Sequence, residues 1–484
     1  MNFKAIRKIL GRILMLEGVL MVVPLVFALA YGDPLWSILA FVITIVGLEA
    51  IGLLLRIKTK NASSFQARDA FVTVGMSWIL MAIFGAIPFV ISGEIPNFIN
   101  ALFEISSGFT TTGASILNDI ESLSKGMLLW RSLSNWIGGM GVLVFILAIT
   151  SDAEQNSTSY LLKAESPGPQ VSKLVSKMRF SARILYLIYI GITVIEMAIL
   201  LIGGMNFFEA VTTSMSTAGT GGFSIMNNSM AFASPFNQCV IGIFMLIFGI
   251  NFSLFYLILI GRVRQFFKSE ELRVYIGIII VSIVIIMINC ASIYNSFGEN
   301  LRNSFFQVSS IITTTGFTTV DYELWPSLSK AILFILMICG ACAGSTGGGM
   351  KISRLIILAK TSYAKIANFV NPRRVKSVKF ESKPVSVEIQ DSIFAFSAIY
   401  FIAIILVALI ISIDNFDIIT NLSASVACIS NIGPGFGLVG PTGNYEAFNG
   451  FSKIILSLEM ILGRLELYPL LVLFSPRTWI RGRF

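Results

Sequence analysis

Long apolar runs, separated by short polar stretches, dominate the sequence. Most of these runs reach the ~20 residues that a helix needs to cross a bilayer. They cover residues 13–30, 35–55, 70–92, 128–150, 184–202, 236–261, 274–289, 331–343, 393–413 and 454–474. The pattern predicts a helical protein that crosses the membrane many times.

Between several of these runs lies a short helical piece that is too brief to span a membrane and leads into a polar stretch. The clearest pieces are residues 98–107, 207–216 and 306–310. Backbone that leaves a helix at this depth is tolerated only where it is buried in protein or lines a water-filled cavity. We therefore predict an all-α polytopic membrane protein. Four pseudo-repeated units, each a helix, a re-entrant half-helix and a helix, surround a central pore beside two N-terminal helices. The predicted parts are an N-terminal hairpin (1–60), unit 1 (61–152), unit 2 (153–265), unit 3 (266–370) and unit 4 (371–484).

Each predicted unit carries a polar stretch that contains a glycine. Glycine accepts positive φ freely, so Thr-Thr-Thr-Gly is expected to run extended with its carbonyls turned to one side, as in an ion filter. Glu104 and Gln307 stand nine residues before the glycines of units 1 and 3, which supports a true repeat, and Glu104 and Glu209 are expected to cap or brace backbone. In unit 4, Gly435 is an alternative to Gly433. The predicted potassium filter residues are Thr111, Thr112, Gly113, Thr220, Gly221, Gly222, Thr314, Thr315, Gly316, Asn431, Ile432 and Gly433.

The distribution of charged residues along the chain matches the order of the predicted spans. The net charge is +9, with 35 Lys and Arg residues against 26 Asp and Glu. Most basic residues fall on one predicted side of the membrane, and the other side is acidic. Because positive charge marks the cytoplasmic face, both termini and the long loops are expected to be cytoplasmic. The basic residues of a nucleic-acid-binding surface would not be confined to the loops on one side of the spans. No nucleic-acid partner is therefore expected, and membrane lipid is the expected surrounding.

The composition argues against catalysis. The chain is 55% hydrophobic and only 13% charged, with a mean hydropathy of +0.82, and it has no histidine. This excludes a Ser-His or Cys-His pair. Cys339 and Cys342 form a CxxC pattern without a second pair or a histidine, so helix packing is expected instead of a zinc or redox site. No covalently bound cofactor is expected.

Two features interrupt the later apolar segments. The stretch Gly344, Ser345, Thr346, Gly347, Gly348 and Gly349 lies where the closing helix of unit 3 would otherwise continue, and each glycine costs about 1 kcal/mol relative to alanine in a helix. We expect a break there at pore depth, with a passive kink as the alternative. Lys351 comes one place too late for a phosphate-binding loop. Arg464 lies within the last apolar run, where it is either a barrier to cations or a structural partner of Glu466 or Glu459.

Several motifs together resemble one family. They are TTTGAS at Thr110, GTGGFS at Gly219, TTTGFTTVDYELWP at Thr313, AGSTGGGMK at Ala343, NIGPG at Asn431 and GRLELYP at Gly463. The chain resembles, over nearly its whole length, the Trk/Ktr/HKT superfamily of potassium transporters, and most closely its bacterial TrkH/TrkG branch.

The resemblance implies potassium uptake across the bacterial cytoplasmic membrane. It implies that residues 344–349, with Lys351 and Arg464, form a gate beneath the filter. Gly113 is expected to favour potassium, because a serine at this position goes with sodium preference in the family. A homodimer and a cytoplasmic nucleotide-binding ring protein of the TrkA type are the implied partners, with the basic segments 163–183 and 360–383 as a contact surface. Channel and symport mechanisms stay open, as do a sodium-coupled or poorly selective cation transporter and, more remotely, a membrane enzyme or scaffold.

Overall fold

Helices make up nearly all of the regular structure. The computed structural model describes residues 1–57, 59, 66–141, 178–370 and 377–479. Within this part of the chain, six helices are long and apolar enough to cross a membrane, and a seventh span results if one bent pair is counted together. The six are Phe3–Tyr31, Leu35–Arg56, Ala67–Ser92, Ala182–Ile202, Glu270–Asn289 and Val387–Asp414. Their outward faces expose apolar side chains, as a lipid-facing surface requires.

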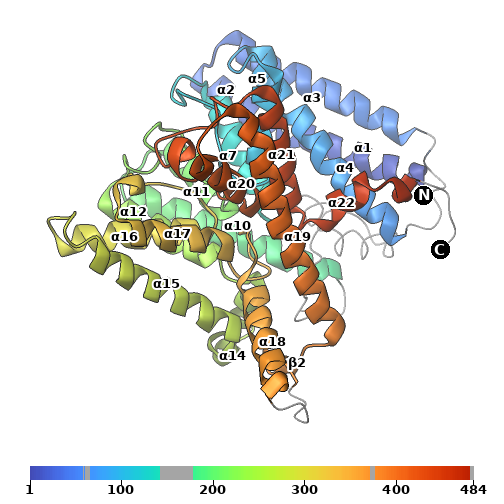
Figure 1. The fold of residues 1–484 in the computed structure, drawn as a ribbon. Coiled ribbons are helices and arrows are strands. Elements are labelled where there is room, and N and C mark those ends of the chain that lie inside the picture. The colour runs from blue at the N-terminus through green and yellow to red at the C-terminus, as the bar shows by residue number, and fades with distance from the viewer. Residues whose placement is uncertain (58, 60–65, 142–177, 371–376, 480–484) are drawn as a thin grey trace.

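The chain begins with a helical hairpin and then repeats one arrangement four times (Figure 1). The hairpin is α1 (Phe3–Leu20), α2 (Val22–Tyr31) and α3 (Leu35–Arg56). Unit 1 contains α4 (Ala67–Gly85), α5 (Ile87–Ser92), α6 (Phe98–Phe109) and α7 (Lys125–Gly139). Unit 2 contains α10 (Met178–Ile202), α11 (Phe207–Gly219), α12 (Pro235–Phe248) and α13 (Phe252–Leu259), followed by the short α14 (Val263–Lys268). This arrangement confirms the predicted fold class.

Units 3 and 4 complete the set. Unit 3 contains α15 (Glu270–Asn289), α16 (Phe297–Ile312), α17 (Ser327–Cys339) and α18 (Ile352–Val370). Unit 4 contains the strands β1 (Lys379–Phe380) and β2 (Lys383–Pro384), then α19 (Val387–Ile411), α20 (Ile418–Ser430), α21 (Gly450–Arg464), α22 (Tyr468–Phe474) and α23 (Pro476–Trp479). The strands pair as one antiparallel hairpin. In Figure 1, α18 and β2 extend from the side of the molecule opposite α2 and α5.

The half-helices α6, α11, α16 and α20 begin with side-chain caps. Asn97, Asn206, Ser296 and Asp417 each accept a hydrogen bond from a backbone N–H in the first turn. Glu209 completes a capping box with Asn206, as expected from the sequence. These caps satisfy N–H groups that have no partner within the helix. The opposite ends of the half-helices meet at the centre of the fold.

The closing helix of unit 2 is broken, whereas its continuous apolar run at 236–261 suggested a single span. α12 and α13 meet at 93°. The carbonyls of Phe248 and Gly249 at the break accept hydrogen bonds from Thr346 and Cys342 of unit 3, and Asn251 caps α13 through Ser253 N–H. Unit 3 therefore provides hydrogen-bond donors for the backbone carbonyls that lose their helical partners at the bend. This makes the bend possible inside a membrane.

Some predicted segments lie outside the described residues. They are the end of the run at 128–150, most of the basic segment 163–183, and residues 371–376 within the second basic segment.

Candidate functional site

The four half-helices end in the same backbone turn. The αL residue after each helix has a φ of 53° to 59°, and the glycine two positions later has a φ of 69° to 98°. In every copy the residue between them donates its N–H to a carbonyl five positions back, at 2.8 or 2.9 Å. This is the helix-ending hydrogen bond of a Schellman motif. The αL residues are Thr111, Thr220, Thr314 and Asn431, and the glycines are Gly113, Gly222, Gly316 and Gly433.

The left-handed threonines differ from the extended strand that the sequence suggested. Asparagine visits this conformation readily, but a β-branched threonine does so only under constraint. Residues held in such a region cost of order 1–3 kcal/mol each and tend to occur at functional sites. Each half-helix therefore ends at its αL residue, and only the residues after it are free to run extended.

The four turns form a closed ring, which we call the glycine ring (residues 111–113, 220–222, 314–316 and 431–433). A methyl group placed on each ring glycine would touch or overlap a carbonyl oxygen of the next unit. The contacts join Gly113 to Gly221, Gly222 to Thr315, Gly316 to Ile432, and Gly433 to Thr112. The fourth unit thus lies against the first. The twelve predicted filter residues are brought together at the centre of the fold.

Gly433, and not Gly435, is the geometric counterpart of the other ring glycines. Gly433 has a φ of +98° and lies against the carbonyl of Thr112. Gly435 has no positive φ, lies against Ser423, and donates its N–H to Val439 at 2.6 Å. Gly435 therefore belongs to the wall outside the ring.

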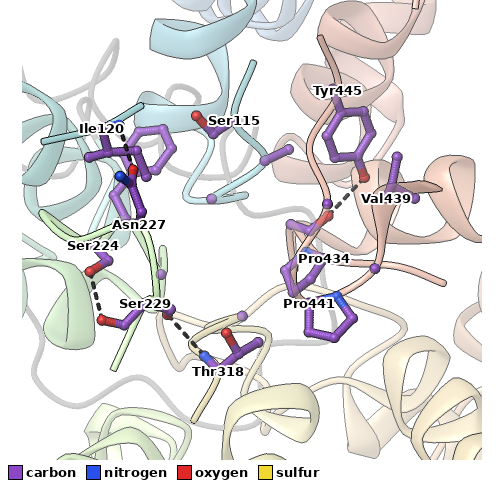
Figure 2. Close-up of a pocket in the computed structure, with 18 of the residues that line it drawn as sticks. Ser115, Ile120, Ser224, Asn227, Ser229, Thr318, Pro434, Val439, Pro441 and Tyr445 are labelled. Atoms are coloured by element: carbon purple, nitrogen blue, oxygen red, sulfur yellow. Dashed lines mark hydrogen bonds between the residues drawn. The ribbon is translucent and has the colours of Figure 1, made fainter. Parts of the chain in front are cut away.

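A cavity of about 100 Å³ opens on one side of the glycine ring, and we call it the mouth. All four ring glycines line it, together with Arg131 and residues that follow the ring in each unit. Figure 2 shows Ser115, Ser224, Thr318 and Pro434 around this space. Tyr445 donates its hydroxyl to the carbonyl of Gly433 at 2.8 Å, which fixes the ring segment of unit 4 (Figure 2). Each unit thus contributes to one shared opening.

The glycine-rich stretch breaks the closing helix of unit 3, and we call residues 340–351 the central loop. α17 ends at Cys339 and α18 begins at Ile352. Gly340, Gly344, Gly349 and Lys351 all have positive φ, so a simple kink does not describe this segment. The loop lies against the glycine ring: Gly348 N–H donates to the Thr314 hydroxyl at 2.7 Å.

Further contacts hold the central loop in place. Thr346 donates to Phe248 O at 3.2 Å, and Phe252 N–H donates to Gly344 O at 3.0 Å, so the loop fills the break between α12 and α13. Glu271 of α15 accepts from Ala343 N–H at 2.7 Å and from Ser353 N–H at 3.0 Å. One carboxylate therefore binds both ends of the loop. Lys351 folds inward, and its ammonium donates to the carbonyl of Gly347.

Arg464 connects the central loop to unit 1. Its guanidinium donates to Thr346 O at 2.8 Å and to the carbonyls of Gly138 and Gly139, which end α7. The C-terminal end of a helix carries partial negative charge and favours a cation there. Of its two suggested partners, Glu466 pairs with Arg354, and Glu459 accepts from the Ser425 hydroxyl at 2.6 Å. These hydrogen bonds of Arg464 go to backbone carbonyls of the central loop and of the end of α7.

Three groups near the site were not singled out from the sequence. Arg131 pairs with Glu104 behind the ring, Glu271 binds the central loop, and Arg354 pairs with Glu466 below it. Arg131 and Arg354 lie in or beside apolar helical segments, and an intramembrane charge was the signal that would have pointed to them. Their partners are 27 and 112 residues away in the chain, which no local pattern reveals.

The comparisons with known proteins agree with this architecture. The family model for TrkH, described as a cation transport protein, matches residues 37–480. The Trk system potassium uptake protein TrkH of Salmonella typhimurium is 35% identical, with 99% of this chain and 100% of that protein covered. The corresponding TrkG of Escherichia coli is 32% identical, with 99% of each chain covered.

A solved structure shares the same fold. The crystal structure of the potassium transporter TrkH from Vibrio parahaemolyticus matches with a TM-score of 0.89 at 29% identity, and the match covers 99% of this chain and 100% of that one. These relatives are transporters and not enzymes, which agrees with the exclusion of catalysis. The family match and the four-unit fold identify this chain as a multi-pass membrane protein of the TrkH family of cation transport proteins.

Proposed function

We propose that this protein takes up potassium through the glycine ring and that the central loop with Arg464 controls the flow. The observation that carries the proposal is the closed ring of four turns of the same kind, one from each unit. Backbone carbonyls arranged around an axis can replace the hydration shell of a potassium ion. The names of the TrkH and TrkG relatives support potassium as the transported ion.

The electrostatic field at the glycine ring favours a cation. The half-helices α6, α11, α16 and α20 direct their C-terminal ends at the ring, and each such end carries about half a negative charge. The rim of the mouth is acidic: Asp119 and Glu121 both bind Asn227, and Glu323 accepts from Gly437 N–H. An acidic rim raises the local concentration of cations. The proposed pathway therefore attracts a cation first and dehydrates it second.

The central loop and Arg464 act as the proposed gate. The loop lies against the ring on the side away from the mouth, through Gly348 and Thr314. If an ion passes at about 8 Å from Arg464 with an effective dielectric near 20, the arginine raises its energy by roughly 2 kcal/mol. Lys351 adds a second positive charge within the loop. Movement of the loop and this charge would open the path.

The direction of transport follows from the membrane potential. The distribution of Lys and Arg supports a cytoplasmic location for both termini and an external location for the mouth. A potential of 100 mV provides about 2.3 kcal/mol per charge, which sustains roughly fifty-fold accumulation. Inward potassium movement in the bacterial cytoplasmic membrane therefore needs no second ion. As in the related family, we propose a homodimer that binds a cytoplasmic nucleotide-binding ring protein of the TrkA type.

The direct test is rubidium uptake into liposomes that contain only this purified protein, at a clamped potential and with sodium as competitor. We expect uptake that follows the potential, excludes sodium and needs no proton or sodium gradient. Equal sodium flux would replace the proposal with a poorly selective cation pathway, and a requirement for an ion gradient would replace it with symport. If flux is absent, adding the cytoplasmic ring protein tests whether the isolated chain is closed.

A further inference from the structure

A buried ion pair lies beside the glycine ring in unit 1, and its arginine also lines the mouth. Glu104 on α6 and Arg131 on α7 are 0% and 1% exposed, and their charged groups meet at 2.8 and 2.9 Å. The carboxylate of Glu104 also accepts from the Ser115 hydroxyl at 2.9 Å and from Ile116 N–H at 3.0 Å. Both residues follow Gly113, so Glu104 ties the half-helix to the chain that leaves the ring.

The same pair reaches the ring segment of unit 2. Arg131 donates to the carbonyl of Ser224 at 3.0 Å, two residues beyond Gly222. Its guanidinium also stacks over Phe223, with 4.2 Å between the central carbon and the ring centre. A planar guanidinium presents its N–H donors in a rigid fork that matches a carboxylate and stacks on an aromatic ring, whereas a lysine ammonium is a compact point charge on a flexible stem. One ion pair therefore fixes both chains that flank the contact between Gly113 and Gly221.

The other contacts between units are built differently. Unit 2 meets unit 3 through Met230 N–H and Thr318 O at 2.9 Å, and unit 4 meets unit 1 through Tyr445 N–H and Ser115 O at 2.8 Å. Unit 3 meets unit 4 through the hydroxyl of Tyr322 and the carbonyl of Gly435 at 2.9 Å. Among these contacts at the ring, in the described part of the chain, the one between units 1 and 2 is flanked by a buried ion pair, whereas the Arg354–Glu466 pair that joins units 3 and 4 lies by the central loop.

Unit 3 contains a neutral counterpart of Glu104. Gln307 occupies the equivalent place nine residues before its ring glycine, and its amide reaches the Thr319 hydroxyl at 3.4 Å. Its side-chain oxygen is buried and has no hydrogen-bond partner. The repeated fold therefore forms without a charge at this position, so the ion pair of unit 1 is not a general requirement of the half-helix.

We propose that Arg131 and Glu104 are specificity-determining positioning residues, which hold the ring segments of units 1 and 2 at the spacing that distinguishes potassium from sodium. The inference rests on the proposed function and assigns both residues a role through the ring segments that they hold. Burying an ion pair is weak evidence for stability alone, because desolvation of both charges offsets their attraction. An ion-binding site needs its ligand groups held within about half an ångström of their working positions. Contacts behind those groups hold them there.

The test is the rubidium-to-sodium permeability ratio of three variants in liposomes. Glu104→Gln combined with Arg131→Met removes both charges without leaving one of them buried alone. Arg131→Lys keeps the charge but loses the fork that joins Glu104 to Ser224. We expect transport to persist in both, with the ratio lowered about tenfold because the ring is no longer held at its spacing. Lys330→Met is the matched control, since it breaks the half-exposed Lys330–Glu323 pair near the mouth and should leave the ratio unchanged.

A purely structural pair would give a different result. It would lower the melting temperature of the variants while the permeability ratio stayed within twofold of the wild type, and this outcome would overturn the inference. If the double variant does not fold, Arg131→Lys decides the question by the same criterion.

A second readout separates this inference from the proposed function. Potassium that binds the folded protein raises its melting temperature relative to sodium, with or without transport. We expect Arg131→Lys to lose that difference and Lys330→Met to keep it. A wild type that keeps the potassium-dependent shift but shows no flux even with the cytoplasmic ring protein would contradict the transport proposal and not this inference. A shift retained by Arg131→Lys would contradict the positioning role.

Discussion

The glycine ring and the central loop touch each other, yet they are built on opposite principles. The ring uses the same turn four times, with φ angles of the same sign and the same helix-ending hydrogen bond in every unit. The loop exists once, in unit 3, and the arginine that binds it comes once, from unit 4.

Under the proposed function, this difference separates two tasks, recognition of the ion and control of its flow. An ion on the axis meets equal groups from every side only if each unit contributes the same backbone, so recognition demands repetition. A barrier that opens and closes needs only one movable segment, and copying it would multiply the contacts to be broken. We therefore expect changes in the ring to alter selectivity and changes in the loop to alter rate.

The largest effect is expected from Gly113→Ser. The new side chain would overlap the carbonyl oxygen of Gly221, and serine is strained at a φ of +77°. A rigid neighbouring backbone cannot move aside cheaply, so we expect the ring to widen and the potassium-to-sodium permeability ratio to fall about a hundredfold, equivalent to ~3 kcal/mol of strain. Liposome flux with each ion alone measures this ratio.

Gly435→Ala is the control for this substitution. Gly435 lies outside the ring and has no positive φ, and a methyl group there meets the Ser423 side chain. Its permeability ratio should stay near that of the wild type. A similar loss of selectivity in both variants would mean that the ring geometry does not decide selectivity.

A somewhat smaller effect is expected from Arg464→Gln, and on rate instead of selectivity. The substitution removes the positive charge between the central loop and the end of α7. Loss of a barrier of roughly 2 kcal/mol corresponds to about a thirtyfold increase in potassium flux. Single-ion uptake at fixed potential measures the change, and a changed permeability ratio with constant flux would contradict the division of tasks.

The smallest of these effects is expected from Glu466→Gln. The Arg354–Glu466 pair joins α18, which follows the loop, to the turn between α21 and α22. The amide retains a hydrogen-bond acceptor but loses the charge, so closure should weaken by about 1 kcal/mol and flux should rise about fivefold. Glu323→Gln, at the half-exposed Lys330 pair, removes an acid far from the loop and should not increase flux. Equal increases in both variants would contradict a specific role of the Arg354–Glu466 pair in closure.

The sequence was sufficient for the fold and for the membership of the glycine ring. Membrane spans appear in the sequence as apolar runs because each span must be apolar across the core of the bilayer. Glu104 and Gln307 mark the same position in two of the units. The break at residues 344–349 was also predictable, since consecutive glycines oppose a helix. These features are local, and local features are what a pattern of residues records.

Other features depend on neighbours that are distant in the chain. The 93° bend between α12 and α13 has no proline or charge to announce it, and the loop residues that bind Phe248 and Gly249 lie about a hundred positions later. The left-handed φ of Thr111 opposes the preference of threonine and is imposed by the helix end and the ring. Likewise, the pairing of Arg131 with Glu104 needs the packing of α6 on α7.

The closure of the ring has a consequence for how this protein can be made. Gly433 lies against the carbonyl of Thr112, so the first and last units meet at a contact that joins residues more than three hundred positions apart. Units enter the membrane in the order of synthesis, and the first three can assemble only an open arc. A chain whose translation stops early would therefore lack the closed glycine ring, which is completed only when the final unit has been inserted.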